Sequence, residues 1–313
     1  MPLERGRIQR NKLLDKLASI LTTAPVGSNE PYWKAVQTGK VVDEGYILYS
    51  KGKSGKDDIY IRLYEGSTQY GYTYMSILEG YKPNPVLGLN GTMIGESPQA
   101  RVEFCNAQYS SYPLTYFLSF DKDKIMLSLA GDPVYHSYAV RTLAWAGMPE
   151  RLSDEPNSNA VTIACSRRAG FFSTYSSMSL NSSGTLTAYT LKNRKYLSGQ
   201  GGGSGTGYSQ DSIYRMYVAS SYKSKGWGDK ITLFPIHLDR SDEGYRSLMA
   251  GIYPIYQDLN NMDFLDGDEI TIGSKRYSVF LVSDDFNKVS TPTGGGYSIN
   301  CFPSIYMAVE HLS

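Results

Sequence analysis

The sequence predicts a mainly β protein, built from β-sandwich or barrel modules and carrying an amphipathic helix at its N-terminus. Three observations lead to this prediction. Several short segments alternate apolar and polar residues with a period of two, which is typical of half-buried strands. Turn-forming residues separate these segments. The 313-residue chain also contains 27 tyrosines, and tyrosine favours the pleated surface of a sheet.

The first predicted element is a helix over residues 4–22. Apolar residues recur there at helical spacing, and charged residues occupy the other side: Leu13, Leu14, Leu17, Ile20 and Leu21 form the apolar stripe. The charges also exclude a signal peptide or a membrane span. A Pro- and Gly-containing stretch over 25–31 ends the helix. Two placements are open: the helix packs on its own domain, or it is an arm that docks on a neighbouring subunit.

The next elements read as strands. Residues 46–49 form a short apolar run, and residues 51–58 form a polar loop. Ile59, Ile61 and Leu63 then alternate with polar or aromatic residues, as expected for a half-buried strand.

Further strands are predicted along the chain, two pairs of them as hairpins. Residues 101–104 alternate in the same way. Residues 116–120 and 125–129 flank an Asp-Lys-Asp turn, and residues 269–272 and 277–281 flank a Gly-Ser-Lys turn. Many strands with turns between them favour sandwich or barrel modules.

Length and composition suggest three parts. Residues 1–30 are expected to form the helical arm and linker, and residues 31–225 a main β domain with a flexible glycine-rich loop at 198–207. A polar stretch near residues 225–230 marks the second boundary. Residues 226–313 are expected to form a small β or α+β module, with a short helix within 241–251.

Charge and cysteine content limit the classes of function. The net charge of +1 gives no bulk attraction to nucleic acid or to an anionic membrane. Cys105, Cys165 and Cys301 are odd in number and far apart in sequence. They therefore indicate reduced, mostly buried thiols and synthesis in a cytoplasm, and not a disulfide framework.

No motif indicates a catalytic, cofactor-binding or metal-binding site. The glycines of 199–207 lack the Lys-Ser or Lys-Thr pair of a phosphate loop, and Gly52-Lys53-Ser54 has Ile47 where such a loop needs its first glycine. Both are interpreted as surface loops. The three histidines, His136, His237 and His311, have no zinc-site spacing. We expect no cofactor, no metal and no enzymatic activity.

Acidic residues are the hardest candidates to exclude, because a glycosidase needs only two carboxylates placed by the fold. Two groups stand out: Asp121 and Asp123 in a predicted turn, and Asp263, Asp266, Asp268 and Glu269 before a predicted strand. The second group surrounds Gly267 but lacks the full register of a calcium loop and its distal glutamate. An acidic turn facing solvent is preferred there. A cell-wall hydrolase using Asp266 and Asp268 is the least favoured hypothesis.

Three segments together resemble virion structural proteins of tailed bacteriophages and prophages. They are residues 43–61, residues 116–138 and residues 266–280, within a likeness that extends over roughly residues 40–285. The resemblance consists of strand-and-turn patterns. It implies a β-rich subunit of the neck, tail or baseplate, and it supplies no catalytic residue.

The expected function is therefore a structural subunit of the virion, at the neck (the head–tail connection) or in the tail, synthesised in the host bacterial cytoplasm. Its expected partners are copies of itself in a ring and other virion proteins, such as portal or connector, tail terminator, sheath or tube. We expect no membrane contact and only incidental contact with nucleic acid. The tyrosines fit strands and subunit interfaces equally well. The alternative is a host-surface glycan-binding module, motivated by these tyrosines and by Trp33, Trp145 and Trp227.

Overall fold

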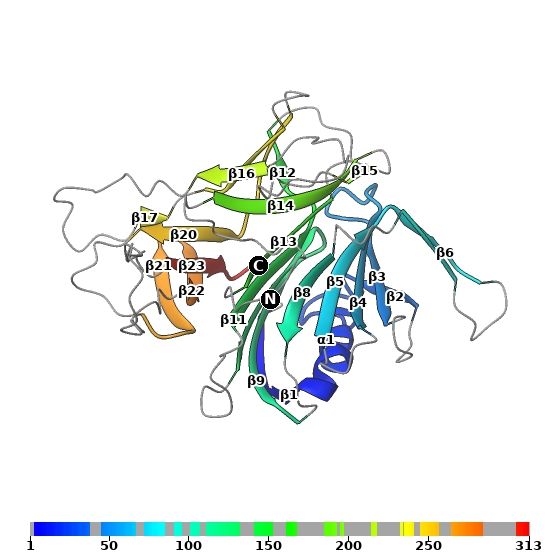
Figure 1. Cartoon of the computed structure of the whole chain (residues 1–313), viewed down its shortest axis with the longest axis horizontal. Coiled ribbons are helices and arrows are strands. Elements are labelled where there is room, and N and C mark those ends of the chain that lie inside the picture. The colour runs from blue at the N-terminus through cyan, green and yellow to red at the C-terminus, as the bar shows by residue number, and fades with distance from the viewer. Residues whose placement is uncertain are drawn as a thin grey trace, which may run out of the picture.

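The chain is rich in strands, which form several antiparallel sheets (Figure 1). The computed structural model describes residues 3–37, 45–66, 72–84, 91–95, 101–106, 111–131, 141–152, 161–167, 185–192, 195–196, 214–217, 232–233, 235–240, 245–256, 264–283 and 305–312. Within these residues no sheet closes into a barrel.

A central sheet runs through the molecule. Its strands, in spatial order, are β1 (Leu3–Gln9), β9 (Pro113–Phe120), β10 (Lys124–Gly131), β11 (Arg141–Gly147), β13 (Thr162–Arg167), β14 (Thr185–Lys192) and β15 (Lys195–Tyr196), with β16 (Tyr214–Tyr217) also paired to β14. The predicted hairpin of 116–129 is confirmed as β9 and β10, since Phe120 pairs with Ile125. The Asp121 N–H donates to the Lys124 carbonyl at 3.0 Å and closes the turn.

Both faces of this central sheet are buried, because successive side chains of a strand point to opposite faces. On β9, Leu118 and Phe120 join one apolar core, whereas Phe117 joins another. On β11, Ala144 lies in the first core and Trp145 in the second. The sheet therefore separates two cores.

A five-stranded sheet covers the first core. Its order is β2 (Lys34–Gln37), β3 (Tyr46–Ser50), β4 (Ile59–Glu65), β5 (Tyr72–Leu78) and β8 (Arg101–Asn106). Leu48, Ile61 and Ile77 of this sheet pack in the same cluster as the inner residues of the central sheet. The predicted strands at 46–49, 59–64 and 101–104 are confirmed.

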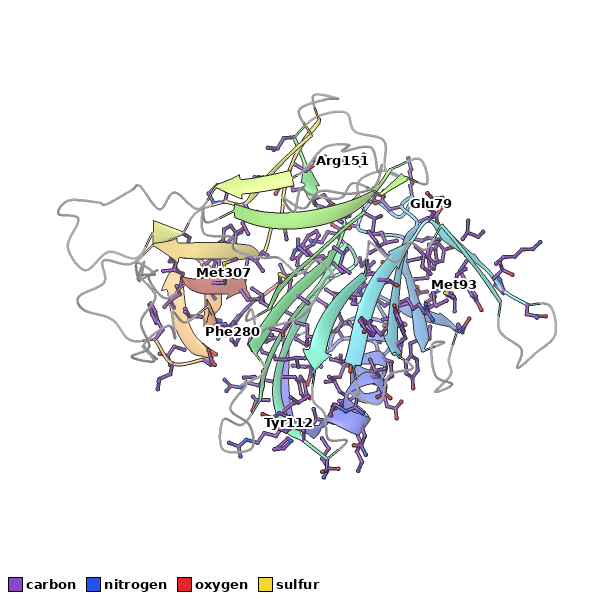
Figure 2. All side chains as sticks on the ribbon, viewed as in Figure 1. Glu79, Met93, Tyr112, Arg151, Phe280 and Met307 are labelled. Atoms are coloured by element: carbon purple, nitrogen blue, oxygen red, sulfur yellow. The ribbon has the colours of Figure 1, made fainter. Side chains whose placement is uncertain are left out.

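Another five-stranded sheet covers the second core. Its order is β17 (Thr232–Leu233), β20 (Ile252–Tyr256), β23 (Ile305–Glu310), β22 (Lys275–Ser283) and β21 (Asp268–Ile272). Phe280 and Met307 reach from it into the second core (Figure 2), and the Phe280 ring lies 4.9 Å from the ring of Phe117. The predicted hairpin of 269–281 is confirmed as β21 and β22.

Two small sheets complete the described structure. One contains β12 (Glu150–Arg151), β19 (Tyr245–Leu248) and β18 (His237–Arg240), and the other is a ribbon of β6 (Gly80–Lys82) and β7 (Thr92–Ile94). The short helix expected within 241–251 is wrong over 245–248, where β19 pairs with β12 and β18. Pairing with the neighbouring strand β18 and with the distant strand β12 overrides the local helical pattern there.

The N-terminal prediction needs a correction. The helix α1 spans only Leu13–Leu21, after a short 3₁₀ turn η1 (Arg10–Lys12), and residues expected to be helical form β1. Strand β1 pairs with β9 along its whole length, so backbone pairing replaces the first helical turns. Leu13, Leu17 and Leu21 are buried in the first core. The helix thus packs on its own domain, one of the two placements that the sequence left open.

Two sequence-based predictions lie outside the described residues: the glycine-rich loop at 198–207 and the boundary near 225–230. The three-part division of the chain stays a prediction. No helix in the described part of the chain is long and apolar enough to span a lipid bilayer.

Candidate functional site

Aromatic side chains line the face of the β2–β8 sheet that points away from the first core. Tyr49 of β3 pairs with Tyr60 of β4, and Tyr64 of β4 pairs with Tyr74 of β5. The ring centroids are 4.8 Å apart in the first pair and 5.3 Å apart in the second. Arg62 lies between the two pairs along β4. We call these five residues the tyrosine–arginine face.

Contacts within this face hold its side chains in place. The Arg62 guanidinium lies 3.9 Å from the centre of the Tyr64 ring, although the residue is only 5% exposed. The Tyr49 hydroxyl donates to Asp58 Oδ1 at 2.8 Å. Burial is the larger cause and the Asp58 carboxylate the smaller one, and together they raise the pKa of Tyr49 to about 12. The Tyr49 phenol therefore stays neutral. Tyr49, Tyr60 and Tyr74 are partly exposed and offer stiff aromatic surface, whereas Tyr64, 4% exposed, and Arg62 are buried beneath them.

A second concentration of polar chemistry joins the β2–β8 sheet to the central sheet. Loop 51–58 follows β3 and meets the turn between β9 and β10. We call Ser50, Lys53, Asp57, Asp121 and Asp123 the inter-sheet polar cluster.

Asp121 is the centre of this cluster and is only 3% exposed. Its Oδ1 accepts the backbone N–H groups of Asp123 and Lys124 at 2.8 and 3.0 Å. Its Oδ2 lies 2.7 Å from Lys53 Nζ and 3.7 Å from Lys124 Nζ. Groups of the chain itself therefore surround this buried carboxylate.

The loop is anchored by its own backbone as well. The Ser50 hydroxyl donates to the Lys122 carbonyl at 2.6 Å, and the Lys53 N–H donates to Asp123 Oδ1 at 2.6 Å. The indole N–H of Trp33 donates to the Asp121 carbonyl at 2.8 Å. Three segments far apart in sequence therefore meet here: Trp33, residues 50–53 and the turn itself.

Two groups of the cluster have shifted pKa values. Burial raises the pKa of Asp123 above its usual value, and the hydrogen bond from the Lys53 N–H opposes this. For Lys53, burial lowers the pKa, but the hydrogen bond to Asp121 and nearby carboxylates outweigh it, so the pKa is raised overall. Lys53 is therefore a cation and not a base or nucleophile near neutral pH.

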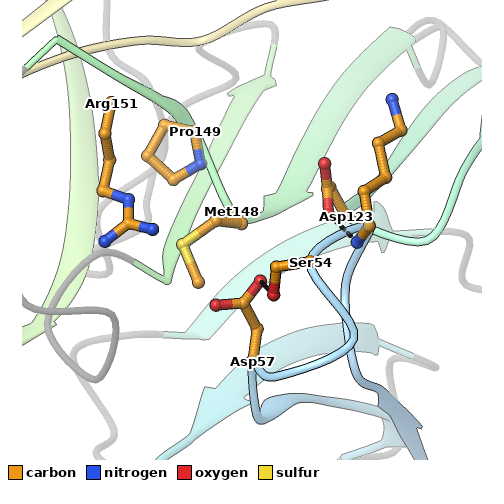
Figure 3. Close-up of a pocket in the computed structure, with 7 residues that line it drawn as sticks. Ser54, Asp57, Asp123, Met148, Pro149 and Arg151 are labelled. Atoms are coloured by element: carbon orange, nitrogen blue, oxygen red, sulfur yellow. Dashed lines mark hydrogen bonds between the residues drawn. The ribbon is translucent and has the colours of Figure 1, made fainter.

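A pocket of about 500 Å³ opens beside the cluster (Figure 3). Lys53, Ser54, Asp57, Asp123, Met148, Pro149 and Arg151 line it. The carboxylate of Asp57 already accepts the Ser54 hydroxyl at 2.7 Å, and Asp123 accepts the Lys53 N–H. The arrangement holds the two sheets together, and its carboxylates are engaged by groups of the chain itself.

The two acidic groups singled out from the sequence lie in different surroundings. Asp121 and Asp123 do occupy a turn, but they are turned toward loop 51–58 and not toward solvent. Asp266 and Glu269 are exposed, and Asp268 Oδ2 accepts the Leu265 N–H within the turn before β21. Asp263 lies outside the described residues. Among the residues that the structure describes, no group of three or more His, Cys, Asp or Glu could hold a metal ion.

The other residues singled out from sequence are dispersed. Gly52-Lys53-Ser54 forms a turn, as interpreted. His311 is buried and lies 2.8 Å, Nε2 to Oγ, from Ser278. His237 lies on β18, Cys105 on β8 and Cys165 on β13, but their side chains, like all of His136 and Cys301, lie outside the described part.

Two of the three tryptophans that motivated glycan binding are unsuited to it. Trp33 and Trp145 are both 0% exposed, so neither ring can stack on a sugar. Each packs in an apolar core and uses its indole N–H for an internal hydrogen bond. Trp227 lies outside the described residues.

Sequence reasoning missed the parts played by Asp57, Lys53 and Arg62. The sequence signal for loop 51–58 is its two glycines. Gly52 and Gly55 both adopt a positive φ in the structure and so define a specific turn. Arg62 looked like an ordinary solvent-facing residue of an alternating strand. The sequence matches no protein-family model, and no curated protein shows significant similarity to it.

Proposed function

We propose that this protein is a structural subunit of a tailed bacteriophage particle, placed at the neck or in the tail and assembling as a ring through tyrosine-rich interfaces. The tyrosine–arginine face is the observation that carries the proposal. Tyrosine and arginine are enriched where protein interfaces bind most tightly. Here Tyr49, Tyr60 and Tyr74 are partly exposed on one sheet face. Ring contacts with each other and with the buried Tyr64, which also contacts the buried Arg62, already order them.

Pre-ordering matters because binding costs side-chain entropy. Stacked rings have few rotamers left to lose, so a partner gains contact area at low entropic cost. A virion subunit must bind its neighbours in one geometry, and fixed aromatic surface suits that role better than flexible side chains.

The ribbon of β6 and β7 adds support. It extends from the body of the molecule (Figure 1), and Met93 lies on it (Figure 2). An isolated two-stranded ribbon is only marginally stable. Ile94 is 38% exposed, so a neighbouring subunit that covers the ribbon would bury apolar surface.

We propose further that the central sheet and the β2–β8 sheet form a β-sandwich, because they share one core that lies between their inner faces. The proposed partners are copies of the chain and adjoining virion proteins of the portal, connector, terminator, sheath or tube type. We expect no turnover of substrate and no contact with a membrane, and the virion is the proposed location.

Imaging of intact particles tests the proposal most directly. Electron cryomicroscopy is expected to place this fold in a ring at the neck or in the tail, with the tyrosine–arginine face against another subunit. Particles made without the protein are expected to fail to join heads to tails or to infect. Normal assembly and infection without it would remove the proposal.

A variant pair tests the face itself. Tyr60→Ala removes one ring of the Tyr49–Tyr60 pair and is expected to reduce ring formation at least about tenfold. Tyr60→Phe keeps the ring and is expected to retain assembly. Circular dichroism of both variants separates lost assembly from lost folding, and equal assembly by both would contradict the interface role.

A host-surface glycan-binding module is the second candidate, and the half-buried Tyr49–Tyr60 pair is the observation that favours it. Aromatic rings with one accessible surface stack on sugars. A glycan array with wild type and Tyr60→Ala tests this candidate. Binding that Tyr60→Ala abolishes would support it, and no binding together with unchanged host adsorption would reject it.

A further inference from the structure

The described sheet edges differ in how well they are protected against pairing with another chain. Edge strand β1 carries Arg5 and Arg7, both exposed. Edge strand β2 carries the exposed Lys34 and an irregular register between Ala35 and Gln37. Charges and bulges are the usual devices that keep edges from associating.

Strand β21 lacks these devices over its second half. It is the last strand of its sheet, and no described strand pairs with its outer side. Residues 270–272 are Ile-Thr-Ile, without charge or proline, and all three favour strands. Thr271 is exposed, and Ile272 is 41% exposed.

No described strand uses the outward backbone groups of this edge, and these groups follow a defined pattern. A two-residue turn joins β21 to β22, because Ile272 pairs with Lys275. The pair that flanks such a turn is hydrogen-bonded, and antiparallel strands direct alternate residues to alternate sides. Ile270 and Ile272 therefore bond to β22, whereas the N–H and C=O groups of Glu269 and Thr271 point outward.

We propose that β21 is a two-fold docking edge for a second copy of this chain. An antiparallel pair centred on Thr271 sets Thr271 of one copy opposite Thr271 of the other. It sets Ile270 of each copy opposite Ile272 of its mate, and Glu269 opposite Gly273. Aligned Ile–Ile and Thr–Thr pairs stabilise antiparallel strands, and no like charges face each other.

Strand β1, the longest of the described edge strands, does not have this property. In an antiparallel pair of identical strands, the two-fold axis passes beside one residue of the strand. That residue lies opposite its own copy, and its two neighbours lie opposite each other. An axis at Gly6 of β1 sets Arg5 opposite Arg7, and an axis at Arg5 sets that arginine opposite itself. Like charges directly opposite are destabilising. Of these two edges, β21 is therefore the self-complementary one.

This inference does not rest on the particle role. A two-fold contact uses the same surface on both copies and cannot continue around a ring of more than two. The β21 contact would therefore join two free subunits, or two rings, and is separate from the tyrosine–arginine face.

Site-directed cross-linking tests the register. In the proposed dimer the two Thr271 Cα atoms are about 5 Å apart, and the two Glu269 Cα atoms are about 14 Å apart. Thr271→Cys is therefore expected to form covalent dimers with a short bismaleimide of about 8 Å reach. Glu269→Cys, also exposed and on the same edge, is the control and is expected to react several-fold less. The wild-type protein, treated in the same way, measures the cross-linking that comes from Cys105, Cys165 and Cys301 alone.

A second pair of variants tests the backbone hydrogen bonds. Thr271→Pro removes an outward N–H that the intrachain ladder does not use, whereas Thr271→Val keeps it. Sedimentation equilibrium is expected to show a dimer dissociation constant weakened at least about tenfold for Thr271→Pro and little changed for Thr271→Val. Unchanged circular dichroism verifies the fold of each variant.

Three results would overturn the inference: equal cross-linking at 271 and 269, a wild-type dimer that Thr271→Pro leaves intact, or a wild-type chain that stays monomeric at all concentrations. A dimer found without any virion role would leave the β21 contact standing and reject the proposed function alone.

Discussion

Gly52 packs closely against the carboxylates of the inter-sheet polar cluster. Its φ is +65°, and a Cβ built there would lie 2.5 Å from Asp57 Oδ2 and 3.1 Å from Asp123 Oδ1. Gly52→Ala would thus combine backbone strain with a clash against two carboxylates. We expect a loss of more than about 2 kcal/mol in the free energy of unfolding.

Gly55 is the matched control, because it has a similar φ of +71° and nothing within 4 Å of its virtual Cβ. Gly55→Ala is expected to cost about 1 kcal/mol, the backbone part alone. Urea denaturation of both variants measures the difference. Equal losses would show that the polar cluster tolerates a methyl group.

His311 makes stability depend on pH. It is buried against Ser278, its Nδ1 has no hydrogen-bond partner among the described residues, and burial lowers its pKa below 6.5. Nearby Arg276 and Arg5 also lower the pKa, and Glu269 opposes them. Below pH 6.5 the unfolded chain binds a proton that the folded chain does not. The free energy of unfolding is therefore not reduced by His311 above pH 6.5, and it decreases as the pH falls below that value.

Thermal denaturation between pH 5 and pH 8 checks this prediction. The wild type is expected to lose more stability toward low pH than His311→Gln, which has no ionisable group at this position. Taking the difference between the two proteins cancels other titrating groups, including Asp123 with its raised pKa. Parallel pH curves would contradict it.

Among the structural elements, loop 51–58 and the β9–β10 turn depend on Asp121. Asp121→Ala removes the acceptor of two backbone N–H groups and leaves Lys124, whose side chain is 9% exposed, without this partner. We expect a loss of about 3 kcal/mol. Lys53→Ala is the comparison, because its side chain is 56% exposed, and it is expected to cost less than about 1 kcal/mol.

Chemical denaturation of Asp121→Ala and Lys53→Ala measures both effects. A similar loss in the two variants would mean that the exposed ion pair, and not the buried carboxylate, holds the loop.

The elements that sequence predicted well are those with local causes. The hairpins predicted at 116–129 and 269–281 combine alternating residues with short polar turns, so each is specified within about a dozen residues. The N-terminal strand was missed because its partner β9 lies more than a hundred residues away, and residues 4–9 carry no local strand signal. The polar cluster was missed for the same reason, since its hydrogen bonds join residues 70 and 72 positions apart. The turn at 121–123 was predictable from the sequence, but its contact with loop 51–58 was not.

At the scale of the whole molecule, the central sheet couples the two cores. Trp145 of β11 lies in one core and its neighbour Ala146 in the other, so neither core can be lost without disturbing the same strands. We expect a single cooperative unfolding transition, with equal calorimetric and van't Hoff enthalpies. Two resolved transitions in differential scanning calorimetry would show that the C-terminal part, predicted from sequence as a separate module, unfolds by itself.

The pairing order of these sheets was beyond sequence reasoning. Strands such as 125–129 are apolar on both faces, which is typical of a strand between two layers, but periodicity does not say which segments provide the layers. Residues 305–310 lie between β20 and β22, and nothing local identifies them as a central strand.

Ser119 has a consequence for how the chain is made. Ser119 pairs with Leu3 in the central sheet. Its hydroxyl donates to the Glu310 carbonyl at 3.0 Å, and the same oxygen accepts the Leu312 N–H at 3.4 Å. During translation, strand β9 leaves the ribosome long before residues 310–312 are synthesised. Until residues 305–312 have emerged from the exit tunnel, water must take the place of these partners at the Ser119 hydroxyl, and this part of the fold cannot close.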